Sequence, residues 1–177
     1  MIIVKNFLSK QQCEEFINLD LGYFHLYRNE GYDNPDKEMN LNNNVYFGPC
    51  RVNKTPRPEI YNYLLDYFKP SVIVSCFVLR YEVNSFLDLH VDVPPQSDIK
   101  GITKVSVVLL NDNFSGGELV FPNHGKSFGI ESVGDLVQIE TITKDSINIH
   151  GVNKISSGTR YSLVIKTVSP IDNAPMV

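Results

Sequence analysis

The spacing of hydrophobic residues changes near residue 70. Before this point, two segments place apolar residues at the three- and four-residue intervals of a helix, over residues 10–19 and 58–69. After it, short β-branched segments alternate with polar turns and predict strands over residues 71–83, 86–92, 102–111, 117–122, 134–140, 146–155 and 159–167. Because the helices come first and the strands afterwards, the order predicts a mostly β, α+β protein. We expect the N-terminal helices to buttress one face of an antiparallel sandwich or barrel.

The beginning of the chain carries the signals of a strand and a capped helix. Residues 1–7 include a short apolar run that predicts a strand. Ser9 then stands where the first helix needs an N-cap, and Gln12 occupies the reciprocal position of a capping box. Leu8 and Cys13 occupy the two positions of a hydrophobic staple, so we expect their side chains to share one apolar environment.

The second helix follows a long segment of different texture. Pro58 suits the first turn of this helix. Five large side chains form one stripe that predicts packing against a sheet: Ile60, Tyr63, Leu64, Tyr67 and Phe68. Residues 20–57 lack sustained periodicity, and a loop of this length is usually functional, so we interpret it as a candidate lid or substrate groove. Farther along, Gly116 and Gly117 predict a tight hairpin turn.

Composition restricts the class of protein. A length of 177 residues, 42% of them hydrophobic, predicts one domain over 1–177, with helical and loop support over 1–70 and a β core over about 71–168. The formal net charge of -4 provides no basic surface for nucleic acid, so we expect no nucleic-acid partner. The 3 cysteines have no metal-ligand spacing, and no segment reaches the about 18 apolar residues of a membrane span. These features favour cytoplasmic localisation without a membrane partner and leave the oligomeric state open.

Three polar residues near strand ends form a candidate metal site. His90 and Asp92 share one face of their predicted strand, because side chains two residues apart point the same way. His150 lies on the polar face of a later strand, where it could meet them across a sandwich. Two imidazoles and one carboxylate form the facial triad that holds iron(II), and zinc accepts the same ligands. Taken alone, His90 and Asp92 would equally fit a structural salt bridge.

An arginine on the next strand adds a site for an anion. Arg160 follows His150 by ten residues, and its planar guanidinium can bind a carboxylate through two hydrogen bonds, which lysine cannot do. Ser162 lies on the same face of the strand and could donate another hydrogen bond. A dicarboxylic acid could therefore be held at Arg160 while its other end chelates the metal.

Four segments in this order resemble the 2-oxoglutarate- and iron(II)-dependent dioxygenases, specifically the prolyl 4-hydroxylase-like branch. They are LRYEVNSFLDLHVD, KVSVVLLNDNFSGGELVFP, GDLVQIE and HGVNKISSGTRYSLVIKT, within residues 74–168. The H-x-D motif alone has little specificity, whereas the whole series, ending in a histidine and an R-x-S motif ten residues later, is specific. The resemblance implies a double-stranded β-helix (jelly-roll) core buttressed by α-helices.

The resemblance also implies the chemistry of the site. His90, Asp92 and His150 would ligate Fe(II), with 2-oxoglutarate and O2 as cosubstrates, and ascorbate stays open as an additional cofactor. The implied reaction releases succinate and CO2 and hydroxylates an unactivated C–H bond. A carboxylate at Asp92 favours hydroxylation over halogenation, because it occupies the position that a halide would need.

The implied cosubstrate contacts come from neighbouring strands. Arg160 would pair with the far carboxylate of 2-oxoglutarate, Ser162 would assist, and Tyr81 would hydrogen-bond the cosubstrate. Some family members use a further hydroxyl on the strand that corresponds to KVSVVLLN, where this chain offers only Ser106. The family's GDLxxFP motif is GDLVQIE here, which changes residues at the edge of the pocket and no ligand.

The branch predicts a peptidyl proline as substrate. Hydroxylation of a free amino acid or another small molecule is an alternative, and Arg51 and Arg80 are candidates for binding a substrate carboxylate. An alternative of another class is a non-catalytic jelly roll that binds metal or a dicarboxylate. The complete set of predicted ligands argues against that class, since a protein that has lost the activity would be expected to lose one of them.

Overall fold

The computed structural model describes residues 1–18, 25–26, 45–49, 58–90, 101–122, 126–128, 132–140 and 148–170. The described helices are α1 (Lys10–Asn18) and α2 (Pro58–Phe68). Neither of them has the length and apolar character needed to cross a bilayer.

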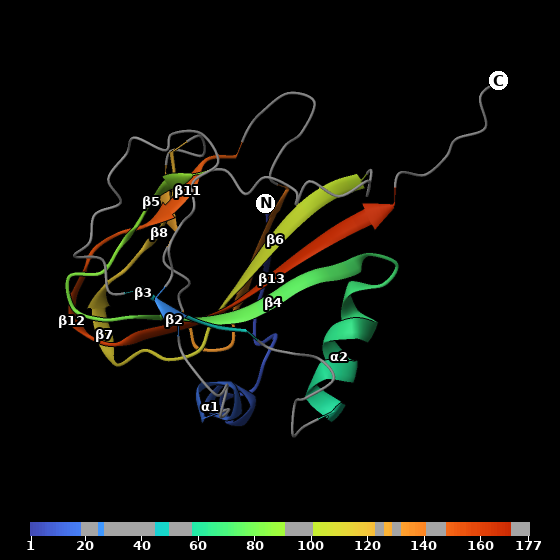
Figure 1. The fold of residues 1–177 in the computed structure, drawn as a ribbon, viewed down its shortest axis with the longest axis horizontal. Helices are drawn as coiled ribbons and strands as arrows, with labels where there is room; N and C mark the ends of the chain where they lie inside the picture. The colour runs from blue at the N-terminus through green and yellow to red at the C-terminus, as the bar shows by residue number, and fades with distance from the viewer. Residues whose placement is uncertain are drawn as a thin grey trace.

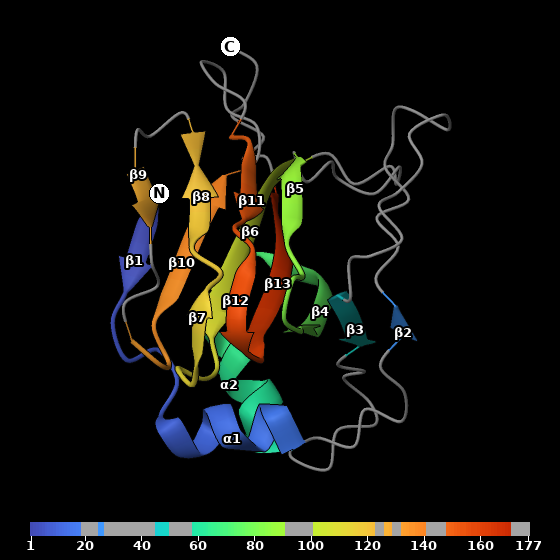
Figure 2. The same cartoon turned by 90° about the vertical axis from the view of Figure 1, so that its left-hand side faces the viewer.

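Antiparallel strands form the body of the protein. In spatial order, the strands of the larger sheet are β1 (Ile2–Val4), β10 (Leu136–Glu140), β6 (Gly101–Leu109), β13 (Arg160–Pro170), β4 (Val72–Tyr81), β3 (Val45–Pro49) and β2 (His25–Leu26). A smaller sheet has the order β5 (Leu87–His90), β11 (His150–Val152), β8 (Leu119–Phe121) and β9 (Lys126–Phe128), and β12 (Ile155–Gly158) pairs with β7 (Phe114–Gly116). The smaller sheets lie across one face of the larger one, and Figure 1 shows α1 and α2 on its other side. Figure 2 shows β5, β11 and β8 in front of β6 and β13, as in the predicted jelly-roll core with helical support.

The two faces of the larger sheet belong to different hydrophobic cores. On β4, Cys76 and Val78 contribute to the core on the helix side, whereas Phe77, Leu79 and Tyr81 contribute to the core between the sheets. This separation follows from the two-residue period of a strand with both faces buried. The core between the sheets contains the candidate site.

The predicted capping box is present at the start of α1. The Gln12 backbone N–H donates to Ser9 Oγ at 3.2 Å, and the Ser9 backbone N–H donates to Gln12 Oε1 at 2.9 Å. Leu8 and Cys13 are both buried in the helix-side core, in agreement with the staple. Burial, with a smaller effect of Glu14, raises the pKa of the Cys13 thiol to about 11.

The predicted stripe on α2 is only partly buried. Leu64 and Phe68 lie in the helix-side core, whereas Tyr63 and Tyr67 are 40% and 41% exposed. Both tyrosine rings instead contact Phe7, with centroids 5.5 Å and 4.7 Å away. The Tyr63 hydroxyl donates to the Phe7 carbonyl at 3.0 Å. A tyrosine can thus cover a core with its ring while its hydroxyl finds a polar partner at the edge.

Several strands arise where the sequence predicts turns or a loop. β7, β9 and β12 occupy segments interpreted as turns, and β2 and β3 extend the larger sheet from within residues 20–57. The prediction of a tight hairpin turn at Gly116 and Gly117 is wrong. The strands on either side of these glycines do not pair with each other, because β7 pairs with β12 while β8 pairs with β11 and β9. The glycines connect strands of different sheets. Most of the candidate lid at residues 20–57 lies outside the described residues.

Candidate active site

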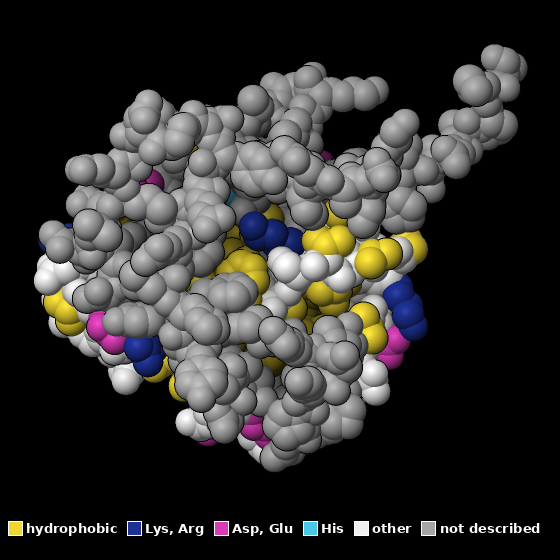
Figure 3. Space-filling model, viewed as in Figure 1, with side chains coloured by type: hydrophobic (Ala, Val, Ile, Leu, Met, Phe, Trp, Pro, Cys, Tyr) yellow, Lys and Arg dark blue, Asp and Glu magenta, His cyan; other side chains and the backbone are white. Residues whose placement is uncertain are grey.

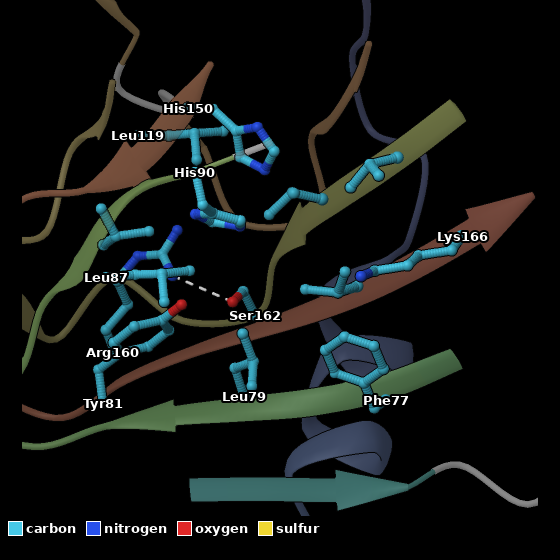
Figure 4. A pocket seen from close by; sticks show the side chains of 14 residues that line it. Phe77, Leu79, Tyr81, Leu87, His90, Leu119, His150, Arg160, Ser162 and Lys166 are labelled. Atoms are coloured by element: carbon cyan, nitrogen blue, oxygen red, sulfur yellow. Dashed lines mark hydrogen bonds between the residues drawn. The ribbon is translucent and has the colours of Figure 1, made fainter. Parts of the chain in front are cut away.

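A pocket lies between the two sheets, and its empty space measures about 420 Å³ when the open solvent at its mouth is included. Apolar side chains of β4, β5, β6, β8, β11 and β13 form most of its wall. Its polar side chains converge from both sheets (Figure 4) and are Tyr81, His90, His150, Arg160, Ser162 and Lys166. An apolar pocket with a few converging polar groups is typical of ligand-binding sites.

The two predicted histidine ligands face each other across a strand pair. His90 on β5 is the register partner of His150 on β11, and their ring centroids lie 4.4 Å apart. The next partners are Leu87 and Val152, so three residue steps on β5 match two on β11. This irregularity sets both histidines toward the pocket. Gly151 permits the close approach, since a Cβ there would lie 2.7 Å from the Leu87 carbonyl oxygen.

Hydrogen bonds to the backbone define the orientation of both imidazoles. His90 Nδ1 lies 2.8 Å from the Asp88 carbonyl oxygen, and His150 Nδ1 lies 3.3 Å from the Asn148 carbonyl oxygen. A carbonyl oxygen can only accept, so in the neutral ring Nδ1 carries the proton and Nε2 carries the lone pair. Metal-binding histidines commonly use such a bond to fix their tautomer. The rings are therefore oriented to offer Nε2 to a metal.

Arg160 is the largest fully buried side chain of the described residues, with 1% of its surface exposed. Its Nη1 donates to Ser162 Oγ at 3.0 Å, and its guanidinium lies 5.2 Å from the Tyr81 ring centroid and 5.9 Å from that of Phe114. Within the described ranges, no carboxylate pairs with it and its Nε has no hydrogen-bond partner. Burial lowers the pKa of the guanidinium, although Tyr81 acts in the opposite direction. A buried cation with only neutral neighbours is costly, and an anionic ligand would offset that cost.

Two neighbouring residues hold Arg160 in place. The Asn111 side chain accepts a hydrogen bond from the Tyr161 backbone N–H at 2.7 Å and donates one to the Thr159 carbonyl at 2.7 Å, on either side of Arg160. Gly117 has a φ of +73°, and a Cβ there would lie 2.9 Å from Arg160 Cδ. The glycine of the GGEL segment thus provides the space that the arginine side chain occupies.

The structure brings together five of the six predicted site residues. His90, His150, Tyr81, Arg160 and Ser162 all line the pocket. The predicted sixth residue, Asp92, lies outside the described residues. Accordingly, among the residues that the structure describes, no group of three His, Cys, Asp or Glu side chains could hold a metal.

The departures from the family pattern lie away from the pocket. Ser106 accepts a hydrogen bond from the Gln138 amide at 3.0 Å, and Lys104 pairs with Glu140 at 3.8 Å. The residues that alternate with these four along β6 and β10 face the core between the sheets. These four residues therefore stabilise the opposite side of the β6–β10 pair, and Ser106 supplies no pocket hydroxyl.

Of the two arginines considered for a substrate carboxylate, only Arg80 is described. It lies on β4 between two pocket residues, Leu79 and Tyr81, so its side chain leaves from the opposite face. Its guanidinium pairs with Glu82 at 3.2 Å. Arg51 lies outside the described residues.

Three residues in or beside the pocket were not predicted from the sequence. Phe114 contacts the Arg160 guanidinium, Phe77 lines the pocket wall, and Lys166 extends across the Phe77 ring with its Nζ 5.9 Å from the ring centroid. The even spacing from Arg160 to Lys166 on a strand would have revealed the lysine. No local sequence signal relates Phe114 to Arg160, because β7 reaches it from another sheet.

No protein-family model matches the sequence, and the comparison with curated proteins found no match. The likeness to solved structures is one of fold. A prolyl hydroxylase from Trichoplax adhaerens, solved with a peptide of the hypoxia-inducible-factor oxygen degradation domain, is 19% identical; the match covers 94% of this chain and 82% of that one, with a TM-score of 0.66.

Two further structures hold ligands. The collagen prolyl hydroxylase of Paramecium Bursaria Chlorella virus-1, in complex with 2-oxoglutarate, is 14% identical over 96% of both chains, with a TM-score of 0.62. HygX from Streptomyces hygroscopicus, with nickel, 2-oxoglutarate and hygromycin B bound, is 14% identical over 97% of this chain and 83% of that one, with a TM-score of 0.58. The chain therefore has the fold of the 2-oxoglutarate- and Fe(II)-dependent oxygenases, as its resemblance to the prolyl 4-hydroxylase-like branch predicts.

Proposed function

We propose that residues 1–177 form a single domain that acts as a 2-oxoglutarate- and Fe(II)-dependent dioxygenase. The observation that carries this proposal is the position of Arg160, a fully buried cation without a carboxylate partner in the described part of the chain, beside a pair of facing histidines. A 2-oxo dicarboxylic acid can be recognised at both ends. One end chelates a metal, and the carboxylate at the other end pairs with a cation.

The described histidines fit a divalent iron ion. His90 and His150 offer Nε2 from adjacent strands, and Asp92, two residues after His90, is the proposed third ligand. Two imidazoles and one carboxylate suit iron(II) and leave coordination positions open. The bound iron and the cosubstrates would supply the oxidation of an unactivated C–H bond, with release of succinate and CO2.

Three other polar side chains of the pocket have a proposed task toward 2-oxoglutarate. Arg160 would bind its far carboxylate in two hydrogen bonds, and the Ser162 hydroxyl, already 3.0 Å from Arg160 Nη1, would bind the same carboxylate. Tyr81 would donate its hydroxyl to the cosubstrate from β4. The apolar wall would exclude water, which strengthens these interactions.

A peptidyl proline is the proposed substrate. Two of the structural neighbours are prolyl hydroxylases, one of them solved with a peptide, which supports this choice. HygX was solved with hygromycin B, so the same fold also accommodates a small molecule, and a free amino acid is the alternative substrate.

The test begins without oxygen. Protein mixed with Fe(II) and 2-oxoglutarate should develop the visible charge-transfer band of the chelate, and His90→Ala or Asp92→Ala should abolish it. Arg160→Met should weaken 2-oxoglutarate binding while the saturated band remains. Arg80→Met, an arginine on the opposite face of β4, is the matched control and should leave the titration unchanged. A wild-type protein with neither a band nor succinate formation in air would refute the proposal.

A further inference from the structure

The strand that carries His150 does not by itself fix the orientation of the imidazole. β11 has 3 residues, begins at His150 and pairs with β5 in an irregular register. The His150 side chain is 4% exposed, and Figure 3 shows only a small area of histidine surface on the face that it draws. A metal ligand must be held within narrow limits of distance and angle, so groups outside β11 have to orient this ring.

Two ring contacts restrict the plane of the His150 imidazole. The Phe121 ring on β8 is stacked against it, with centroids 5.9 Å apart and an angle of 27° between the planes, and the centroid of the His90 ring lies 4.4 Å away. Both contacts involve the ring as a whole, so they would persist after a half-turn about the Cβ–Cγ bond, which exchanges nitrogen and carbon positions. They therefore do not determine which ring atom faces a metal.

A hydrogen bond to the backbone of Asn148 does determine it. The Asn148 carbonyl accepts from His150 Nδ1 at 3.3 Å, and a half-turn of the ring would put a carbon atom in the place of this nitrogen. The bond leaves Nε2 as the atom available to a metal. The orientation of His150 thus depends on the position of the Asn148 backbone.

The side chain of Asn148 anchors this backbone to the larger sheet. Its amide donates to the carbonyl of Glu140, the last residue of β10, at 2.5 Å. Asn148 is buried and precedes β11, so the strand pairing of the smaller sheet does not include it. Figure 2 shows β10 behind β8, with its end near β11. The amide therefore connects the end of the larger sheet to the residue whose carbonyl orients His150.

We propose that Asn148 is a positioning residue of the metal site, because its amide holds in place the carbonyl that orients His150. This inference rests on the proposed dioxygenase function, which assigns His150 to Fe(II). In this role Asn148 touches neither the metal nor 2-oxoglutarate. It acts on the affinity of the site for its metal.

The test compares two replacements of Asn148 with a matched control. Asn148→Ala removes the amide, and Asn148→Leu also removes it but fills the space, so a loss shared by both variants is due to the amide and not to a cavity. The control is Asn153→Ala. Asn153 directly follows β11, is exposed, and donates through its amide to the Glu118 carboxylate at 3.1 Å. If one Asn148 variant does not fold, the other still provides the comparison.

The first measurement is the binding of Co(II) alone, an oxygen-stable probe of the Fe(II) site, by calorimetry below the melting temperature of each protein. Both Asn148 variants should bind Co(II) about 10- to 100-fold more weakly, the usual effect of removing a group that orients a metal ligand. Asn153→Ala should bind it as the wild type does. At saturating Fe(II), the affinity for 2-oxoglutarate should stay unchanged, whereas general damage to the pocket would weaken both ligands.

The second measurement needs no metal. At a pH at which the imidazoles are neutral, nitrogen NMR of the metal-free wild type should show the His150 proton on Nδ1. In the Asn148 variants the signal should move toward a mixture of the two tautomers. In Asn153→Ala it should keep the wild-type position.

Two results would overturn the inference alone. One is wild-type Co(II) affinity together with the wild-type tautomer in the Asn148 variants. The other is an equal loss of Co(II) affinity in Asn153→Ala, which would assign the effect to the stability of β11. In both cases a wild type that forms the visible band and succinate keeps its dioxygenase function. A wild type that binds neither Co(II) nor Fe(II) would instead refute the metal site, and with it both the function and the inference.

Discussion

Replacement of Gly117 by alanine should damage stability and 2-oxoglutarate binding together. The residue has a φ of +73°, and a left-handed conformation costs a non-glycine residue about 1–2 kcal/mol. The added Cβ would lie 2.4 Å from Ile155 Cδ1 and 2.9 Å from Arg160 Cδ, and such overpacking costs about 1–3 kcal/mol. The combined loss is about 2–5 kcal/mol, which lowers the melting temperature by about 4–20 °C.

The effect on binding follows from the displacement of Arg160. A shift of Arg160 by a few tenths of an ångström should impair its hydrogen bonds to the carboxylate, and a loss of about 1.4 kcal/mol there would weaken 2-oxoglutarate binding about tenfold. The assay is a titration of the visible band below the melting temperature. Gly116→Ala is the control, since its Cβ would clash with the Lys154 carbonyl at 2.3 Å and not with Arg160. Equal 2-oxoglutarate affinities in the two alanine variants would refute the reasoning.

Three further predictions concern single side chains. Arg160→Met should raise the dissociation constant of 2-oxoglutarate by about 10- to 100-fold in the band titration, while Arg80→Met leaves it unchanged. The Asp135 carboxylate is buried, which alone would raise its pKa, but hydrogen bonds from the Asn6 N–H and Lys5, both at 2.9 Å, lower the pKa below its ordinary 3.8. The Asp135 carboxylate therefore stabilises the fold above pH 3.8, and this stabilisation is lost as the pH falls through the lower pKa of the folded state. In urea unfolding between pH 6 and 3, the free energy of unfolding should fall more steeply in the wild type than in Asp135→Asn. Ser9→Ala should lower the free energy of unfolding by about 1 kcal/mol through loss of the N-cap, and an unchanged urea midpoint would contradict this role.

The periodic elements of the fold could be predicted from the sequence. The capping box at Ser9 and the long strands β4, β6, β10 and β13 depend on local patterns, and both were confirmed. The short strands β7 and β12 could not be predicted, because their pairing is set by contacts between distant segments. The exposure of Tyr63 also had no local signal, since it depends on the position of Phe7.

The structure places predicted site residues side by side where one strand carries two of them in phase. Arg160 and Ser162 share a face of β13 and were predicted to lie together. The position of His90 opposite His150 depends on an irregular register between β5 and β11. The alternation of residues along each strand does not predict such an irregularity. The packing of Gly117 against Arg160 likewise appears only in three dimensions, so a glycine that the sequence assigns to a turn becomes a positioning residue.

If this chain oxidises 2-oxoglutarate with molecular oxygen, one oxygen atom of the gas must appear in the succinate. Protein loaded with Fe(II) and 2-oxoglutarate is exposed to ¹⁸O2, and the succinate is analysed by mass spectrometry. We expect succinate that carries one ¹⁸O atom from the gas, and no succinate from His150→Ala. Succinate without the label, or the same amount of labelled succinate from His150→Ala, would refute the proposed dioxygenase function.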